Sequence, residues 1–190
     1  KPTMGGLYQH FTSIADAVGI PGVLYNVPSR TALNMDAATT LRLAQVPNIV
    51  GVKEASSDAD QIAYVIKDSP DGFRVWSGND NETFATMATG GYGIVSVAGN
   101  IISGQVQKMM GLLLEGDVEA AAAEHLRLLP IFNALFIITN PIPVRYAINR
   151  SGFDVGPARL PMIPESAELE SFSTRFDPIM DQYAIDLSEA

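Results

Sequence analysis

Side chains that could do chemistry stand at the ends of three predicted strands. Tyr25 closes one apolar run, Lys53 emerges from the next, and Asn79 follows a third. In parallel α/β architectures the carboxyl ends of the strands meet at one edge, where binding and catalytic sites form. The spacing therefore predicts a site that gathers these residues.

Lys53 is the most informative of them. It follows the apolar run 49–52 directly, so we expect it to be partly desolvated, and desolvation favours the neutral amine. A neutral lysine amine can attack a carbonyl carbon. The commoner alternative is a lysine that reaches solvent along its stem or pairs with Glu54 or Asp58. The pattern alone leaves both interpretations open.

Three further residues near these strand ends have a functional and a structural interpretation. Tyr25 could move protons, or it could be a packing aromatic with a bonded hydroxyl. Arg30, in the predicted loop after Pro28, could bind a carboxylate, or it could be a solvated loop arginine. Gly78 could let a ligand approach the backbone, or it could serve a turn. For each residue alone the structural interpretation is favoured.

Other polar residues favour structural roles. Ser57 is predicted to cap one helix, and Asp80 and Glu82 are predicted to cap and charge the first turn of the next. His10 and His125 lie on predicted helices far apart in sequence, so no metal site is expected. The sequence contains no Walker loop, no GxGxxG and no GxSxG motif.

The composition limits the classes of function. The chain has 190 residues, 47% of them hydrophobic, which suffices for a domain with a sizeable core. Its formal net charge of −9 argues against binding to nucleic acid or to an anionic membrane. The absence of cysteine excludes disulfides and thiolate metal sites, and it fits a reducing cytoplasm. The run 131–138 is too short to span a bilayer, and no signal peptide is visible.

The order of the predicted elements indicates an α/β fold. A helix over 7–18 precedes four apolar strands, each followed by a helix. This alternation implies βαβ units and a parallel sheet. After Gly116 the pattern becomes helical, so we expect a region 1–116 with the strands and a helical region 117–190. The predicted strands are 22–27, 49–52, 73–76 and 94–98, and the later helices are 118–139, 144–149 and 165–183.

Several ordered segments resemble the dihydrodipicolinate synthases, within the pyruvate-dependent Schiff-base lyases. Tyr25–Thr31 is similar to the tyrosine motif of that family, and Gly51–Ser56 is similar to its Schiff-base lysine motif. Further similar segments follow in the family's order, and the resemblance covers essentially the whole chain. They are Leu7–Phe11, Ser77–Asp80, Gly93–Ser96 and Asn140–Val144.

The resemblance implies a function and roles for residues. Lys53 would form the imine with pyruvate, and Tyr25 would shuttle protons. Arg30 would bind the carboxylate of aspartate semialdehyde, Val95 would lie at the pyruvate pocket, and Gly78 close to it. The implied reaction is the condensation of pyruvate with aspartate semialdehyde, which belongs to diaminopimelate and lysine biosynthesis and needs no cofactor. The family also implies a cytoplasmic homotetramer.

The resemblance implies a (β/α)8 barrel with a C-terminal helical extension, yet only four strands are predicted. A complete barrel needs about 250 residues. Together with a first residue that is not Met, this leads us to expect the second half of the barrel, in a fragment with doubtful activity of its own. Two rivals remain. One is another pyruvate aldolase, such as a sialic-acid lyase, which would usually lack Arg30. The other is a non-catalytic half-barrel that assembles with a partner or with itself.

Overall fold

The protein folds into two compact units. The computed structural model describes residues 1–183 and 185. The first unit is Lys1–Val95 and the second is Ser96–Ala190. All the described strands lie in the first unit, and the second consists of helices and connecting segments.

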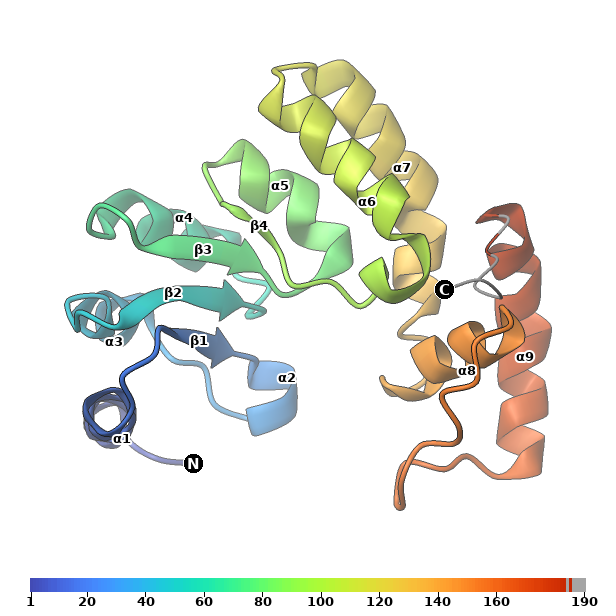
Figure 1. Cartoon of the computed structure of the whole chain (residues 1–190), viewed down its shortest axis with the longest axis horizontal. Coiled ribbons are helices and arrows are strands. Elements are labelled where there is room, and N and C mark those ends of the chain that lie inside the picture. Colours follow the sequence, from blue (N-terminus) through green and yellow to red (C-terminus); the bar gives the residue numbers. More distant parts are fainter. Residues whose placement is uncertain (184, 186–190) are drawn as a thin grey trace. The chain divides into compact units, whose positions relative to one another are not determined.

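The first unit is a four-stranded parallel sheet with helices between its strands (Figure 1). The strand order is β1-β2-β3-β4, so each strand pairs with its neighbour along the chain. This arrangement confirms the predicted alternation of strands and helices. The elements are α1 Met4–Ala17, β1 Gly22–Asn26, α2 Pro28–Thr31, α3 Ala37–Leu43, β2 Ile49–Glu54, α4 Ala59–Asp68, β3 Arg74–Ser77, the 3₁₀ helix η1 Asp80–Glu82, α5 Thr83–Ala88 and β4 Gly93–Ile94.

The sheet has one face in the core and one that is largely open. Leu24, Val52 and Val75 are in register across three strands and are buried. Because side chains alternate along a strand, the next residue of each strand points to the opposite face. That face carries Tyr25 and Lys53. The helix side of the core is completed by side chains from α1, α3 and α4, among them Ala15, Leu43, Ile62 and Val65.

Some strand and helix limits differ from those predicted. β2 continues through Lys53 and Glu54, because both residues pair with β1. β4 has only two residues, since the hydroxyl of Ser96 accepts a hydrogen bond from the N–H of Gly99 and the chain turns into the next helix. Arg30 lies in the unpredicted one-turn helix α2, not in a loop. Pro28 favours that turn because its φ angle is already helical.

Two predicted helix caps are wrong. Ser57 has a φ of 60°, and the following residue, Asp58, caps α4 by accepting a hydrogen bond from the N–H of Gln61 at 2.9 Å. Asp80 and Glu82 do lie in the first turn of a helix, η1, as predicted. Asp80 is not a cap, because it lies inside η1, and α5 starts without a side-chain cap at Glu82. At α4 the backbone conformation of the turn decides which polar residue faces the helix end.

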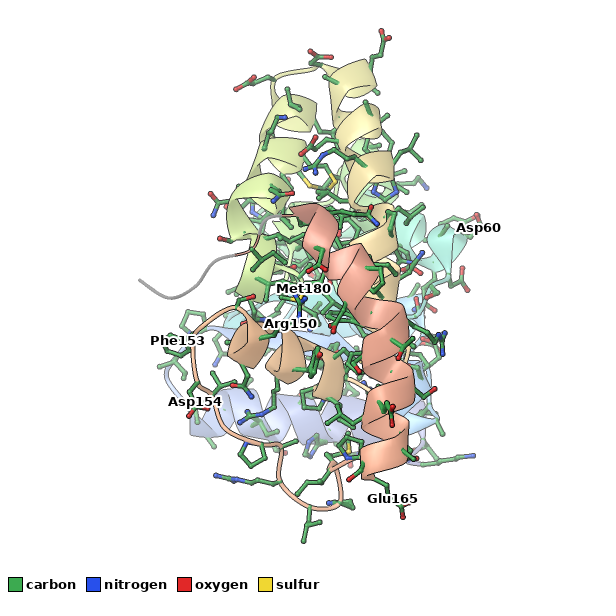
Figure 2. The ribbon with its side chains drawn as sticks, turned by 90° about the vertical axis from the view of Figure 1, so that its right-hand side faces the viewer. Asp60, Arg150, Phe153, Asp154, Glu165 and Met180 are labelled. Atoms are coloured by element: carbon green, nitrogen blue, oxygen red, sulfur yellow. The ribbon has the colours of Figure 1, made fainter. Side chains whose placement is uncertain are left out.

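The second unit packs four helices around aromatic and aliphatic side chains. Phe172 and Phe176 are buried, and the ring of Tyr146 contacts both of them edge-on. Arg150 lies near Met180 (Figure 2). Its guanidinium is 2.8 Å from the carboxylate of Asp181, which follows Met180. The elements are α6 Gly99–Leu114, α7 Val118–Ala134, α8 Ile142–Arg150, α9 Ser166–Met180 and the 3₁₀ helix η2 Asp181–Tyr183. Of the predicted helices, the one over 118–139 ends early, at Ala134.

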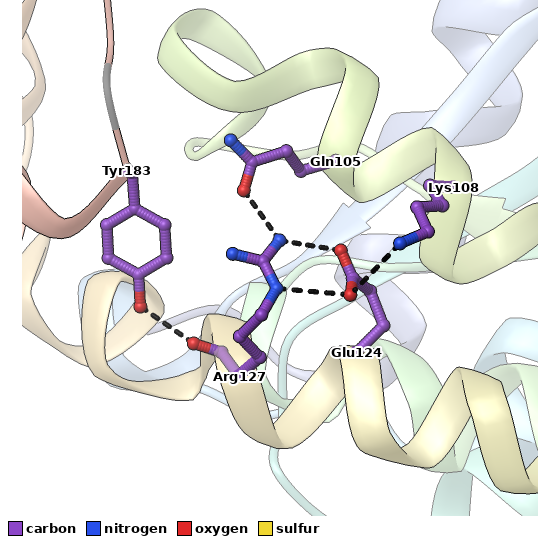
Figure 3. A network of polar contacts seen from close by, with 5 residues as sticks. All are labelled: Gln105, Lys108, Glu124, Arg127 and Tyr183. Atoms are coloured by element: carbon purple, nitrogen blue, oxygen red, sulfur yellow. Dashed lines mark hydrogen bonds and ion pairs between the residues drawn. The ribbon is translucent and has the colours of Figure 1, made fainter.

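A buried carboxylate joins α6 and α7 (Figure 3). Glu124, whose side chain is 8% exposed, accepts hydrogen bonds from the guanidinium of Arg127 at 2.6 and 3.1 Å and lies 3.5 Å from the ammonium of Lys108. Arg127 also donates to Gln105, and its carbonyl accepts from the hydroxyl of Tyr183. The hydrogen bonds from Arg127 hold the pKa of Glu124 below its usual value.

We expect Glu124→Gln to lower the free energy of unfolding by about 1–2 kcal/mol, because the partners are half-exposed and screened by solvent. Since the folded pKa is depressed, the stabilisation is present above the unfolded pKa and is lost as pH falls through the folded pKa. The deficit of the variant should therefore shrink in acid. Urea unfolding at several pH values measures it, with exposed Glu170→Gln as the control. A deficit independent of pH would contradict the assignment.

The open face and the edges of the sheet predict self-association. Val23, Tyr25 and Val95 are 48%, 49% and 45% exposed, and β1 and β4 are edge strands. Exposed edges and apolar faces pair readily with other chains. We expect the purified chain of 190 residues to form soluble oligomers through these surfaces. Size-exclusion chromatography with light scattering checks this, and a soluble, cooperatively folding monomer would contradict it.

Candidate active site

The structure places Tyr25 and Lys53 side by side. They are register partners across β1 and β2. The Lys53 ammonium nitrogen Nζ lies 4.3 Å from the centroid of the Tyr25 ring, within the range of an attractive cation–π contact. Lys53 is half-buried, and Tyr25 is about half exposed. The amine of Lys53 and the phenol of Tyr25 therefore share the open face near the carboxyl ends of their strands.

Gly78 lies against the stem of Lys53. A Cβ atom at residue 78 would be 3.2 Å from Cε of Lys53, 2.7 Å from Cβ of Ala55 and 3.0 Å from the carbonyl oxygen of Glu54. The N–H of Gly78 donates to that same carbonyl at 2.6 Å. Residue 78 must therefore be glycine, because the neighbouring atoms lie too close for a Cβ atom. The lack of a side chain there leaves room for the stem of Lys53.

Val95 and Arg30 lie at the same edge of the sheet. Val95 follows β4, and its N–H donates to the carbonyl of Ser77 at 3.0 Å, which places it beside Gly78. Arg30 lies on α2, which directly follows β1, and its side chain is exposed. All five predicted site residues thus belong to segments at the carboxyl ends of the strands. Tyr25, Lys53 and Gly78 are the three that the structure brings into one contiguous group.

The alternative in which Lys53 pairs with a neighbouring acid is wrong. Among residues 1–183 and 185, Lys53 forms no ion pair. Glu54 points to the helix side of the sheet, because successive residues of a strand face opposite sides. Asp58 instead caps α4. The amine of Lys53 is therefore not neutralised by a carboxylate within the described chain.

Sequence reasoning missed the role of Glu54. Its carboxylate is fully buried and accepts hydrogen bonds from the side chains of Asn26 and Gln61 and from the N–H of Ser56. The signal was an acidic residue two positions after buried Val52, on the apolar face of the same strand. Because the partner residues come from β1 and α4, spacing along one segment could not identify them.

Metal sites and membrane spans have no candidates in the described part of the chain. No group of three or more His, Cys, Asp or Glu side chains able to hold a metal ion occurs among these residues. No helix among them has both the length and the apolar character that crossing a membrane requires.

Comparisons with known proteins place most of the chain in one family. Residues 1–175 match the Dihydrodipicolinate synthetase family. The 4-hydroxy-tetrahydrodipicolinate synthase of Symbiobacterium thermophilum is 50% identical over 171 residues, covering 90% of this chain and 58% of the relative. The crystal structure of dihydrodipicolinate synthase from Aquifex aeolicus has a TM-score of 0.92 at 37% identity, covering 100% of this chain and 64% of that one. The chloride-inhibited dihydrodipicolinate synthase from Acinetobacter baumannii, complexed with pyruvate, has a TM-score of 0.85 at 35% identity, covering 94% and 62%.

The chain belongs to the dihydrodipicolinate synthetase family. Its α/β fold with a parallel sheet is part of a (β/α)8 barrel, which confirms the predicted fold class. The chain spans 58% and 54% of the length of the first two curated relatives that it matches.

We expect Gly78→Ala to lower the free energy of unfolding by about 1–3 kcal/mol, because the new methyl group meets backbone that cannot move away easily. Gly111→Ala is the matched control. Gly111 lies inside α6, and a methyl group added there would meet nothing within 4 Å, so this change should stabilise by about 0.5–1 kcal/mol. Urea unfolding compares the two, and equal effects would show that crowding at residue 78 is unimportant.

Proposed function

We propose that this chain carries the Schiff-base part of a 4-hydroxy-tetrahydrodipicolinate synthase, which condenses pyruvate with aspartate semialdehyde on the route to diaminopimelate and lysine. The observation that carries the proposal is the amine of Lys53 beside the ring of Tyr25, on the open face and, among the described residues, without an ion pair. In this proposal residues 1–116 are the second half of the barrel, and 117–190 are its helical extension.

The proposed reaction begins with the amine of Lys53. It attacks the C2 carbonyl carbon of pyruvate, and loss of water leaves an imine. Loss of a proton from C3 gives an enamine, for which the imine nitrogen is the electron sink, so no cofactor is needed. C3 then forms a carbon–carbon bond with the aldehyde carbon, whose oxygen takes up a proton. The amine of the second substrate finally attacks the imine carbon, which closes the ring and releases Lys53.

The neighbouring residues receive supporting roles. Tyr25 moves protons between substrate and solvent, for which a half-exposed phenol beside the amine is suited. Gly78 and Val95 border the pyruvate pocket beside the lysine stem, and Arg30 binds the carboxylate of the aldehyde. The pyruvate complex of the Acinetobacter baumannii relative supports a pyruvate site in this family.

We also propose a cellular location and an oligomeric state for the enzyme. We assign it to the cytoplasm, which the cysteine-free composition fits, since thiol chemistry and disulfides play no part in its stability. We also propose that it works as a homo-oligomer, a homotetramer by resemblance to the family. The exposed apolar residues of the sheet supply surface for contacts between chains.

Trapping with borohydride tests the proposed function. Pyruvate and borohydride should leave a stable adduct on Lys53. Borohydride delivers hydride to the carbon of the imine, which converts the imine into a secondary amine that keeps the ligand on the lysine nitrogen. Peptide mass spectrometry locates the adduct. Lys53→Arg, which keeps the charge but removes the nucleophilic amine, is the control and should give none. An adduct on Lys67 or Lys108 in place of Lys53 would overturn the assignment.

Arg30→Ala should weaken the use of the aldehyde but not the reaction with pyruvate. Loss of a charge-assisted contact should weaken transition-state binding of the aldehyde by about 2–4 kcal/mol. Formation of the pyruvate imine should stay nearly unchanged. Adding aspartate semialdehyde before borohydride should deplete the Lys53 adduct in the parent chain but much less in the variant, with exposed Arg159→Ala as the control. Equal loss of imine formation and of depletion would mean that Arg30 is structural.

A further inference from the structure

A carboxylate is buried directly behind the proposed reactive lysine. Glu54 follows Lys53 in β2, points to the helix side of the sheet and is 0% exposed. No ion pair to Glu54 occurs within residues 1–183 and 185. Burial of a carboxylate without a cation is costly, and an apolar side chain of similar volume would avoid that cost. Its presence calls for a role that an apolar residue could not fill.

The carboxylate is held by neutral donors from three segments. Nδ2 of Asn26 donates to its two oxygens at 3.0 and 3.1 Å, and the N–H of Ser56 donates at 2.8 Å. Nε2 of Gln61, on α4, donates at 3.4 Å. Asn34 bonds to Asn26 and Gln61, which links the segment before α3 to the same cluster. We call Asn26, Asn34, Glu54 and Gln61 the amide–carboxylate cluster.

The cluster lies one residue beyond the reactive pair. Asn26 and Glu54 are register partners, as are Tyr25 and Lys53 immediately before them. A slip of one residue would turn every following side chain to the other face of the sheet. The backbone supports the same register, since the N–H of Ala55 donates to the carbonyl of Asn26 at 2.9 Å. The cluster therefore fixes which faces Tyr25 and Lys53 occupy at the end of the sheet.

We infer that Glu54, Asn26 and Gln61 are positioning residues that hold Lys53 against Tyr25. The inference deepens the proposed function and rests on it. The inferred role depends on the pairing of hydrogen-bond donors with acceptors. A carboxylate only accepts hydrogen bonds, and the amide groups of Asn26 and Gln61 donate to it. None of these residues is assigned contact with a substrate, because all lie on the helix side of the sheet. They act through the backbone of β1 and β2.

A reciprocal exchange tests the match. Asn26→Asp places a carboxylate against Glu54, and Glu54→Gln places a donor against the donors of Asn26 and Gln61. Each single change should slow borohydride-trapped imine formation on Lys53 by about tenfold. The double variant, Asn26→Asp with Glu54→Gln, again opposes a donor to an acceptor with one buried carboxylate. It should recover at least threefold over the slower single variant.

Matched changes control for loss of fold. Asn48→Asp alters an amide that bonds to the carbonyls of Ala15 and Val18 at the other end of the strands, and Glu124→Gln alters a buried carboxylate of the second unit. Both should leave the trapping rate within twofold of the parent. Circular dichroism compares the folding of all variants. Should Glu54→Gln not fold, Gln61→Leu removes one of the donors to the carboxylate, together with the bonds of Gln61 to Asn34 and Met35, and should slow trapping by about threefold.

A second readout keeps the inference separate from the proposed function. Acetic anhydride modifies lysines without any substrate, and exposed Lys67 serves as the internal reference. Folded single variants should raise the modification of Lys53 relative to Lys67 at least threefold, as Lys53 leaves the ring of Tyr25. A parent chain that traps no pyruvate on Lys53 would overturn the proposed function, while the modification ratio would still decide the inference. Unchanged ratios and trapping rates in folded variants, or no recovery in the double variant, would overturn it.

Discussion

The register between β1 and β2 is the constraint on which the site depends. It sets Tyr25 opposite Lys53 and brings the amine to 4.3 Å from the centroid of the phenol ring. These two residues are 28 positions apart in the sequence, yet parallel pairing gives them adjacent places at the carboxyl edge of the sheet. Gly78 enters the same place from β3, where any side chain would press on the lysine stem.

One face of the strands packs in the core, and the opposite face carries the residues of the candidate site. Leu24, Val52 and Val75 pack against helices and anchor the strands, while their neighbours on the opposite face remain accessible. The separation is not between apolar and polar residues, because Glu54 is fully buried on the helix side. A polar group there is tolerated because neutral donors saturate it. The two buried carboxylates differ accordingly: Glu124 is bound by cations, and Glu54 is bound by amides.

Features set by local pattern could be predicted from the sequence. The alternation of strands and helices, and the position of Lys53 at the end of a buried strand, follow from short apolar runs and turn residues. The capping of α4 could not be resolved, because choosing Asp58 over Ser57 required the backbone angles of the turn. The extent of β4 was overestimated for a similar reason, since an apolar run does not show where a chain bends.

The buried residues around the site could not be predicted from the sequence, for a different reason. The cluster around Glu54 unites residues 26, 34, 54 and 61, so it exists only once the register and the packing of α4 are fixed. From sequence, Glu54 is simply an acid beside a lysine, and pairing the two was a reasonable hypothesis. The alternation of side chains along β2 excludes it. Resemblance to a family could identify Lys53 and Tyr25 by motif, but the contacts that hold them required coordinates.

The most direct test of this account is a crystal structure of the chain treated with pyruvate and borohydride. We expect continuous electron density from Nζ of Lys53 to C2 of the reduced ligand, on the open face of the sheet beside Tyr25 and Gly78. The Asn26–Glu54 hydrogen bonds should remain intact in that structure. An unmodified Lys53 with the ligand attached to another lysine, or a Lys53 turned to the helix side, would contradict the account.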